Sequence, residues 1–392
     1  MPAHPRNPAV RLTDGAFYGN DPHTHLAWLR ENAPVYWDEV GQVWGITLHE
    51  DVFTLSKDNQ TWRSSGGIRP DTPAMPYMID MDDPDHRKRR ALVSKGFTPR
   101  QVTAREQRAR EVSIDLIERA KARGQFDFVK DVAAWLPLIM IGDMLGVDPA
   151  DYPLLLEWSE TMLNATGAMD IERALAAGKA FEDYTAYQRR VIDDRRRNPG
   201  EDLVSILVHA EVDGERLTDD ELIMESLLIL IGGDETTRHV LSGGMHQLLL
   251  HPEQRAALAA DPSRIPTAVE EMLRWVSPIQ NMSRTASRDV ELRGETIREG
   301  EKVILLYPSA NRDAKVFADP FRFDSARKPN DHIAFGLGGH FCLGSNLARL
   351  ELRVFFEEAL QRLPDLQLAS DEPPPLRPSN FVSGIESLPV TC

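Results

Sequence analysis

Residues 335–344 read Phe-Gly-Leu-Gly-Gly-His-Phe-Cys-Leu-Gly and continue to residue 351 as Ser-Asn-Leu-Ala-Arg-Leu-Glu. Four glycines surround a single cysteine, Cys342, and from Leu343 onward the apolar residues recur at helical spacing. Each glycine weakens a regular helix or strand by about 0.5–1 kcal/mol, so this cluster indicates positive φ angles or the close approach of a flat group. The stretch therefore predicts a tight loop that presents one sulfur atom at the start of a helix.

The position of Cys342 at a predicted helix start makes it a candidate metal ligand. A cysteine at the N-terminus of a helix meets the positive end of the helix dipole and free backbone N–H groups, which favour the thiolate over the thiol. One thiolate is too few for an iron–sulfur cluster or a structural zinc site, each of which needs about four ligands. A single axial thiolate on haem iron remains, beside the alternative of an ordinary buried cysteine in a glycine-rich turn.

The pattern Phe335-Gly336-x-Gly338-x-His340-x-Cys342-x-Gly344 resembles the signature of the cytochrome P450 family, the haem-thiolate monooxygenases. The resemblance implies a mainly α-helical fold with small β-sheets, in which haem b lies between a long central helix and the loop and helix that bear the cysteine. Cys342 would then be the thiolate ligand of the iron, and Phe335, Gly336 and Gly344 would contact the haem.

Composition excludes several other classes of protein. The 392 residues are 42% hydrophobic and 27% charged, as in an ordinary globular chain, and the net charge of −16 argues against nucleic-acid binding. No apolar run approaches the roughly 18–20 residues of a membrane anchor, the start of the chain has no hydrophobic signal region, and two cysteines make no disulfide framework. We expect a cytoplasmic protein with a single domain over residues 1–392, of which residues 1–20 form a loosely packed arm.

A long central helix is predicted after Thr218. The sequence Thr218-Asp219-Asp220-Glu221 is a capping box, and no proline follows before Leu250. Because apolar residues lie nearly all round this helix, we expect it to be buried and roughly 48 Å long. Two glycines and two threonines within residues 232–237 predict that its hydrogen-bond ladder opens or kinks there.

Residues 232–237, Gly-Gly-Asp-Glu-Thr-Thr, resemble the oxygen-activation motif of the same family. Gly233, Glu235 and Thr236 take the matching positions. The resemblance implies that Glu235 and Thr236 are catalytic and relay protons through water to dioxygen at the haem, since a carboxylate and a hydroxyl suit such a relay. The alternative is a helix kink with surface polar groups.

Several basic side chains are candidates for binding the haem propionates. His86 and Arg90 stand four residues apart, so they share one face of a helix and suit a pair of carboxylates. In the family a His-x-x-x-Arg at this point binds a propionate, and the resemblance adds Arg284 and His340 as further candidates. The alternative is a solvated basic helix start.

The same region predicts a positive surface. Between Arg87 and Arg110 there are nine Lys or Arg residues and one acidic residue, within a chain of strongly negative net charge. Such a surface can attract an acidic partner over long distances. The resemblance implies a ferredoxin, supplied with electrons by a ferredoxin reductase; the alternative is a solvated face without a partner.

Glu271 and Arg274 stand three residues apart on another predicted helix and match the Glu-x-x-Arg motif of the family. The later segment Pro320-Phe321-Arg322-Phe323 resembles the one whose arginine joins this pair, which makes Arg322 the third member. Truncating one member of such a buried network costs about 3–5 kcal/mol. We therefore assign these residues to folding and haem incorporation.

A substrate pocket is expected beside the haem. Residues 62–84 are broken by glycines and prolines, and long loops of this kind are commonly binding loops, although an ordinary surface connection is the alternative. Residues 378–385 form a second turn, whose apolar tip can close the pocket. The candidate pocket residues are Ile68, Met75, Met78, Ile79, Gly233, Met282, Phe381 and Val382.

The runs 232–244, 270–275 and 380–389 look close to the actinobacterial hydroxylases of the cholesterol side chain. This resemblance implies a hydrophobic sterol substrate, cholesterol or cholest-4-en-3-one, that is hydroxylated at its terminal methyl. Another terpenoid or a branched fatty acid fits the same pocket. A peroxide-driven haem enzyme and a haem gas sensor are the rival functions, and the intact pair Glu235 and Thr236 disfavours both.

Overall fold

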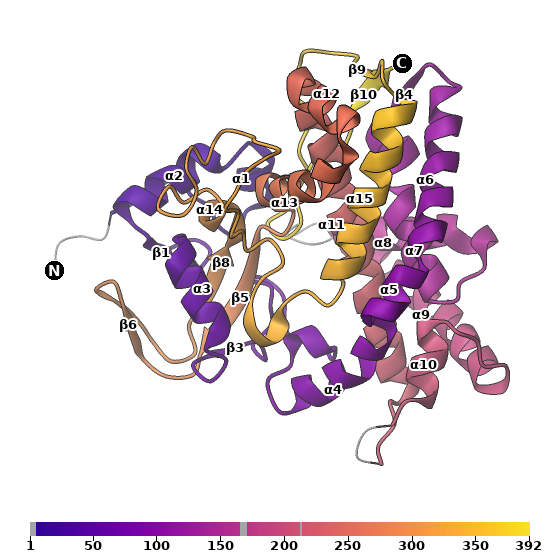
Figure 1. The fold of residues 1–392 in the computed structure, drawn as a ribbon. Helices are drawn as coiled ribbons and strands as arrows, with labels where there is room; N and C mark the ends of the chain where they lie inside the picture. Colours follow the sequence, from indigo (N-terminus) through magenta and orange to yellow (C-terminus); the bar gives the residue numbers. More distant parts are fainter. Residues whose placement is uncertain (1–4, 165–170, 212–213) are drawn as a thin grey trace.

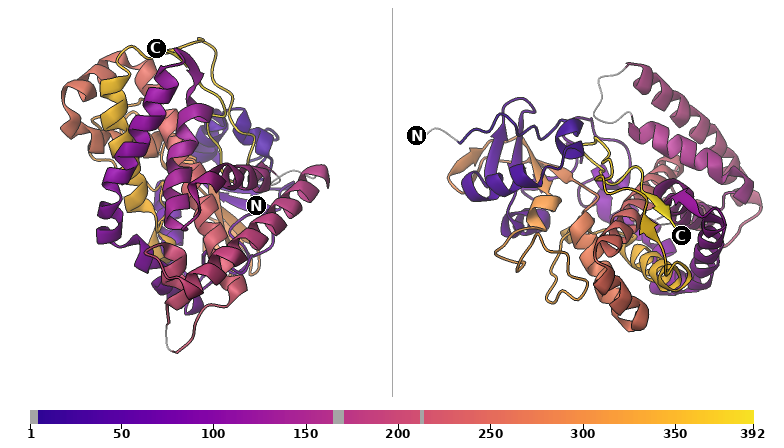
Figure 2. Two further views of the ribbon diagram at one scale, coloured as in Figure 1. Left: turned by 90° about the vertical axis from the view of Figure 1, so that its right-hand side faces the viewer. Right: turned by 90° about the horizontal axis from the view of Figure 1, so that it is seen from above.

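The computed structural model describes residues 5–164, 171–211 and 214–392. Figures 1 and 2 show a region that contains the first strands of the chain beside a larger, mostly helical region. The described helices are α1 (Gly15–Gly19), α2 (His23–Asn32), α3 (His49–Lys57), α4 (Asp85–Val93), α5 (Pro99–Ala104), α6 (Glu106–Lys121), α7 (Trp135–Met144), α8 (Tyr152–Asn164), α9 (Ile171–Arg197), α10 (Leu203–His209), α11 (Asp219–Leu250), α12 (Pro252–Ala260), α13 (Ile265–Val276), α14 (Tyr307–Ala310) and α15 (Ser345–Arg362).

Three small sheets accompany these helices in the described parts of the chain. The largest has the order β1-β2-β8-β5-β3, with β2 and β8 parallel and its other neighbours antiparallel; the others are β4-β10-β9 and β6-β7. The mainly helical fold with small sheets is therefore confirmed. The strands are β1 (Val35–Asp38), β2 (Val43–Ile46), β3 (Trp62–Arg63), β4 (Gln125–Asp127), β5 (Asn281–Ala286), β6 (Val290–Leu292), β7 (Glu295–Ile297), β8 (Lys302–Leu306), β9 (Gln367–Leu368) and β10 (Pro389–Thr391).

Helix α11 runs through the middle of the helical region, as the apolar pattern predicts. Thr218 and Glu221 form the expected capping box at its start, and α7, α13 and α15 pack against it. The expected opening of its ladder is not seen as a break, because α11 stays helical through Gly232 and Gly233. Instead, the Cβ position of Gly233 lies 2.5 Å from the Ile141 side chain, so this glycine lets α7 approach closely.

Helix α15 follows the Cys loop, which we define as residues 335–344. Val354, Phe355 and Phe356 are completely buried on α15, against α6 and α13. Positive φ angles occur at Gly336 (66°) and Gly338 (71°), as the glycine cluster predicts. At Gly338 a Cβ atom would lie 2.3 Å from the Ser56 carbonyl oxygen, so the loop packs tightly against the end of α3.

The N-terminal segment is not a loosely packed arm from Val10 onward, and that expectation is wrong. Val10, Leu12 and Tyr18 are each at most 1% exposed and share an apolar cluster with strand β8. The Leu12 N–H donates to Asp38 at 2.7 Å, and the Tyr18 hydroxyl donates to the Leu12 carbonyl at 2.9 Å. Polar neighbours in the sequence concealed this apolar spacing. None of the described helices is long and apolar enough to span a bilayer.

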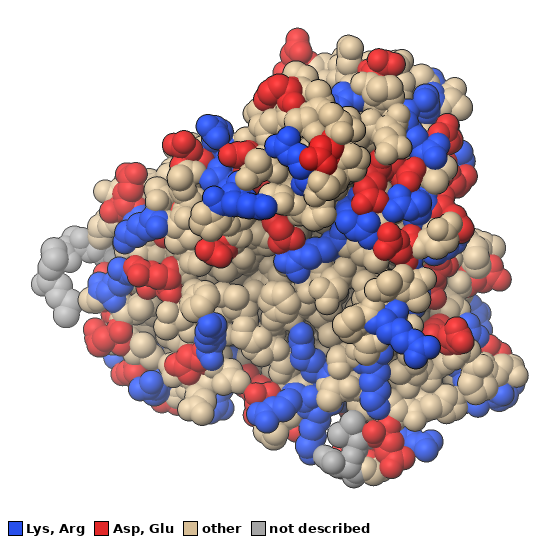
Figure 3. All heavy atoms as spheres, viewed as in Figure 1, with Lys and Arg blue, Asp and Glu red and all other residues tan. Residues whose placement is uncertain are grey.

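Lysine and arginine side chains gather over α4 and α5, on the same face of the molecule as the Cys loop (Figures 1 and 3). Arg89, Arg108 and Arg110 form ion pairs with acidic residues of neighbouring elements. The exposed cations between Arg87 and Arg110 are Arg87, Lys88, Lys95, Arg100 and Arg108, of which Arg87 and Arg108 each pair with an aspartate. The positive surface is thus narrower than the count of basic residues predicts.

Candidate active site

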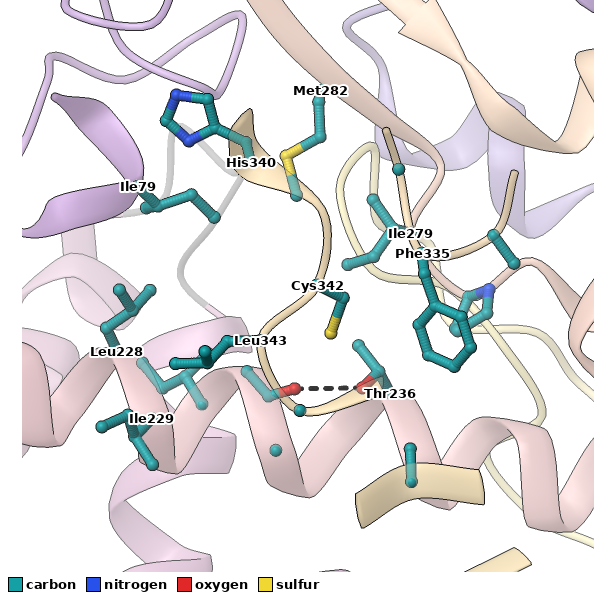
Figure 4. A pocket seen from close by; sticks show the side chains of 18 of the residues that line it. Ile79, Leu228, Ile229, Thr236, Ile279, Met282, Phe335, His340, Cys342 and Leu343 are labelled. Carbon is teal, nitrogen blue, oxygen red and sulfur yellow. Dashed lines mark hydrogen bonds between the residues drawn. The ribbon is translucent and has the colours of Figure 1, made fainter. Parts of the chain in front are cut away.

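A largely apolar cavity lies between α11 and the Cys loop (Figure 4). Figure 4 shows the Cys342 sulfur pointing into it, toward the turn of α11 that contains Thr236. Phe335, Gly336 and Gly344 line the cavity beside Cys342, as predicted. The two elements that the sequence singles out therefore face each other across one space.

The surroundings of Cys342 do not by themselves favour a thiolate. Burial raises the pKa of the thiol, although the N–H groups of Gly344 and Ser345 and the charges of Arg90 and Arg349 lower it in part. The expectation that the helix start alone favours the thiolate is therefore wrong, because desolvation outweighs these N–H groups and charges. A bound metal cation supplies the missing positive charge, as it does for any coordinating thiol.

Four basic or imidazole side chains line another part of the cavity, and they come from three elements: His86 and Arg90 from α4, Arg284 from β5 and His340 from the Cys loop. The rings of His86 and His340 stack with centroids 3.9 Å apart. Burial and the nearby charge of Arg284 lower the pKa of His340 to about 2.

Among the described residues, no carboxylate forms an ion pair with Arg90 or Arg284, whose guanidinium groups donate to backbone carbonyls. Arg284 is 5% exposed, and its guanidinium donates a hydrogen bond to the Ser283 carbonyl at 2.7 Å. His86 faces one acidic group, Asp83, at 3.4 Å. Buried cations without partners are costly, so the cluster suits a ligand with anionic groups. An apolar slot, a sulfur and a cationic end together fit haem, with its iron and its two propionates.

Thr236 lines the cavity, and its hydroxyl donates to the Gly232 carbonyl at 3.0 Å (Figure 4). Glu235, the other half of the predicted relay, does not line the cavity and is completely buried. Its carboxylate accepts hydrogen bonds from Arg238 at 3.3 Å and from Arg377 at 2.8 Å. Burial opposes ionisation, but His239 and the two arginines outweigh it and lower the pKa of Glu235.

Comparison with known proteins decides the family. A family model described as Cytochrome P450 matches residues 168–390. The steroid C26-monooxygenase of Mycolicibacterium smegmatis is 49% identical over 98% of this chain and 96% of that protein, and the one of Mycobacterium tuberculosis is 49% identical over 98% and 97%. The crystal structure of Mycobacterium marinum cytochrome P450 CYP268A2 in complex with pseudoionone covers 100% of both chains, with 34% identity and a TM-score of 0.91.

The chain belongs to the cytochrome P450 family. It is thus a haem-thiolate monooxygenase, with haem b as its cofactor. A second kind of relative is also similar: the methyl-branched lipid omega-hydroxylase of Mycobacterium tuberculosis is 40% identical over 97% of this chain and 91% of that protein.

Most predicted pocket residues of this cytochrome P450 meet at the cavity. Its lining includes Ile68, Met78, Ile79, Gly233, Met282, Phe381 and Val382. Met75 is the exception, since it is 41% exposed and does not line the cavity. The reason is local: the Met75 N–H donates to the Asp80 carboxylate at 2.7 Å, and this hydrogen bond belongs to an outward turn of the loop.

The structural network of this cytochrome P450 differs from the prediction in one member. Arg274 donates to Glu271 at 2.7 and 2.8 Å, and both are completely buried. Arg322 does not join them, because its side chain is 67% exposed and pairs with Asp324. Arg327 takes its place and donates to Glu271 at 3.0 Å, while Arg322 contributes its backbone carbonyl as an acceptor for Arg327 at 2.8 Å.

Two acidic residues near the haem site escaped the sequence reasoning. Asp234 is completely buried and accepts a hydrogen bond from Ser159 of α8 at 2.9 Å. Glu351 lines the cavity from α15, and burial raises its pKa well above the ordinary value. A signal existed for Glu351, since it follows Leu350 and precedes Val354 on the apolar face of α15, where a carboxylate is unusual.

Proposed function

We propose that this cytochrome P450 hydroxylates the terminal methyl of a steroid side chain, such as that of cholesterol or cholest-4-en-3-one, with dioxygen. The observation that supports the substrate class is the 49% identity to steroid C26-monooxygenases over nearly the whole chain. The apolar lining between the Cys loop and the tip formed by Phe381 and Val382 suits a long, uncharged substrate.

The proposed roles of the residues follow from their positions. Haem supplies the oxygen-activating chemistry when it is bound. Cys342 binds its iron, and His86, Arg90, Arg284 and His340 bind its propionates. The Thr236 hydroxyl holds a proton at the cavity wall, while the Glu235 carboxylate, one residue earlier on α11, accepts protons outside the cavity and passes them on toward it. Apolar side chains exclude bulk water from the reacting methyl.

Electrons come from a redox partner in this family, and we assign that role to a ferredoxin with its reductase. Arg87, Lys88, Lys95 and Arg100 are exposed on α4 and the two elements that follow it, and Arg90 of α4 donates to the carbonyl of Phe341, which is itself 38% exposed. An exposed apolar residue beside elements that carry exposed cations suits an acidic partner. Neither Cys342 nor Cys392 forms a disulfide, which agrees with a reducing compartment, so we keep the cytoplasm as the expected location.

A titration with sterols, followed by the haem absorption, tests the substrate. We expect cholest-4-en-3-one to displace water from the ferric iron and shift it to the high-spin state. Turnover with ferredoxin and reductase should then yield a product oxygenated at the terminal methyl. A spin shift and turnover with methyl-branched fatty acids but with no sterol would instead favour the second candidate, hydroxylation of methyl-branched lipids, which the 40% identical relative supports.

A further inference from the structure

Arg69 lines the cavity with a guanidinium that has no ion-pair partner in the described part of the chain. Its guanidinium carbon lies 4.5 Å from the centre of the Phe381 ring, which holds the group by a cation–π contact. The Nε atom is buried and has no hydrogen-bond acceptor. An arginine at an apolar cavity without such acceptors has donors left for a ligand.

The backbone around Arg69 is firmly held, so these donors have a defined position. The Ile68 N–H donates to Asp80 at 2.8 Å, and Lys302 donates to the Arg69 carbonyl at 3.1 Å. Asp80 also accepts from the Met75 N–H at 2.7 Å, so both oxygens of this carboxylate already have partners. Asp71 accepts from Asn380 at 3.0 Å. Other groups therefore donate to Asp80 and Asp71. Neither carboxylate accepts a hydrogen bond from the Arg69 side chain.

Tyr77 lies on the same loop and lines the same cavity. Its residue is 8% exposed, and no described residue forms a hydrogen bond with its hydroxyl. Burial raises its pKa, although the charge of Arg69 lowers it in part, so the phenol keeps its proton and remains a donor. Tyr77 and Arg69 are thus two neighbouring donors without acceptors.

Most of the other polar side chains of the cavity already have uses, apart from Thr237, Tyr307 and Glu351. His86, Arg90, Arg284 and His340 form the cluster assigned to the propionates, and the Thr236 hydroxyl donates to Gly232. We propose that Arg69 and Tyr77 form a subsite that binds a hydrogen-bond-accepting oxygen of the substrate, away from the methyl that reacts. This subsite rests on the proposed function, because it assumes a long apolar substrate whose reacting end lies beside Thr236.

Two sources supply such an oxygen: the 3-oxygen of a sterol ring or the carboxylate of a branched acid. Paired ligands separate them. The sterol pair is cholest-4-en-3-one and cholest-4-ene, which lacks the oxygen, and the acid pair is a methyl-branched fatty acid and the matching branched alkane. For each protein variant, the ratio of the two dissociation constants is measured by the haem spin shift.

We expect the haem-loaded wild-type enzyme to bind the oxygenated member of at least one pair roughly 10- to 100-fold more tightly, as for one hydrogen bond from a charged donor. Arg69→Met should reduce that ratio to about 1–3, and Tyr77→Phe should reduce it roughly 3-fold. Arg63→Met, which removes an exposed arginine outside the cavity, is the matched control and should leave the ratio unchanged.

Unchanged ratios in Arg69→Met for both pairs, with a normal ferrous–CO spectrum and an unchanged melting temperature, would overturn the subsite. That result differs from a failure of the proposed function, in which the wild-type enzyme shows no spin shift or turnover with any sterol. If Arg69→Met reduces the ratio of dissociation constants for the acid pair alone, the subsite is supported and the oxygen that it binds is that of a carboxylate.

Discussion

The Arg377 guanidinium donates a hydrogen bond to the Glu235 carboxylate at 2.8 Å, and both side chains are buried. This contact joins the C-terminal loop, residues 377–384, to α11 beside Thr236. The loop is closed by a hydrogen bond from the Arg377 N–H to the Gly384 carbonyl at 2.9 Å, and a Cβ atom at Gly384 would lie 2.4 Å from the His239 ring. The tip that lines the substrate cavity is thus anchored on the carboxylate assigned to proton supply.

Arg377→Gln should destabilise this connection. The substitution leaves Glu235 with Arg238 as its remaining arginine partner, and removing one member of a buried ion pair costs about 3 kcal/mol. Urea denaturation of the haem-loaded protein measures the change. Arg377→Lys keeps the charge and should recover part of the loss, whereas a stability equal to that of the wild type in Arg377→Gln would contradict the anchoring role.

Glu235→Gln should slow product formation by about 100-fold or more, because its side chain takes part in the proton relay. The same carboxylate anchors the pocket tip through Arg377, so the dissociation constant of the substrate is measured beside the rate. The readouts are the product rate and the spin-shift titration with the same substrate. A weaker dissociation constant with an unchanged rate would show that Glu235 acts through pocket shape alone.

Thr236→Ala should increase the fraction of electrons released as peroxide, because the Thr236 hydroxyl lies at the cavity wall formed by α11. Thr236→Ser retains the hydroxyl and is the matched control. Coupling is measured as product formed per reduced nicotinamide consumed. Equal coupling in the alanine variant and the wild type would remove Thr236 from the relay.

Arg327 and Arg322 offer a direct comparison within one turn. Arg327→Met removes a buried donor to Glu271 and should cost about 3 kcal/mol of stability and reduce haem content. Arg322→Met changes a side chain that is 67% exposed, so its effect should stay within about 0.5 kcal/mol. Thermal denaturation and the haem-to-protein absorbance ratio test both variants, and the reverse ranking would refute the assignment.

Glu225 predicts a pH dependence of stability. Burial raises its pKa from 4.5 to about 7, although Arg89 and the Met78 N–H lower it in part. Between these values the folded state binds a proton that the unfolded state has released, so the stability contributed by this group falls as pH rises from 4.5 to 7, by up to about 3 kcal/mol. Above pH 7 the loss is complete.

Glu225→Gln should remove this pH-dependent part of the stability, whereas Glu372→Gln, at an exposed loop position, should keep it. Urea denaturation at pH 5 and pH 7 measures the difference for each protein. If the stability of Glu225→Gln falls between the two pH values as much as that of the wild type, then Glu225 is not the group responsible.

The sequence predicts those features of the fold that depend on residues close together in the chain. The capping box at Thr218 and the positive φ angles at Gly336 and Gly338 are visible in the sequence because each needs particular residue types within a few positions. The facing of Cys342 and Thr236 across one cavity followed from family resemblance, since no local pattern relates residues more than a hundred positions apart.

The errors concern properties that tertiary packing decides. Arg322 and Arg327 lie in one irregular turn, and nothing in their spacing shows which guanidinium points inward toward Glu271. Resemblance places the apolar residue Met75 in the pocket, but in the fold its N–H donates to Asp80 and the residue is 41% exposed outside the cavity. The thiol of Cys342 was expected to ionise from its helix position, whereas burial, which depends on the whole fold, dominates its pKa.

The binding of haem iron by the Cys342 thiolate is tested most directly by the ferrous–CO absorption spectrum of the wild type and Cys342→His. We predict the red-shifted band of a haem-thiolate protein in the wild type and its loss in the histidine variant, with haem still bound. Persistence of that band in Cys342→His would contradict the assignment of Cys342 as the iron ligand.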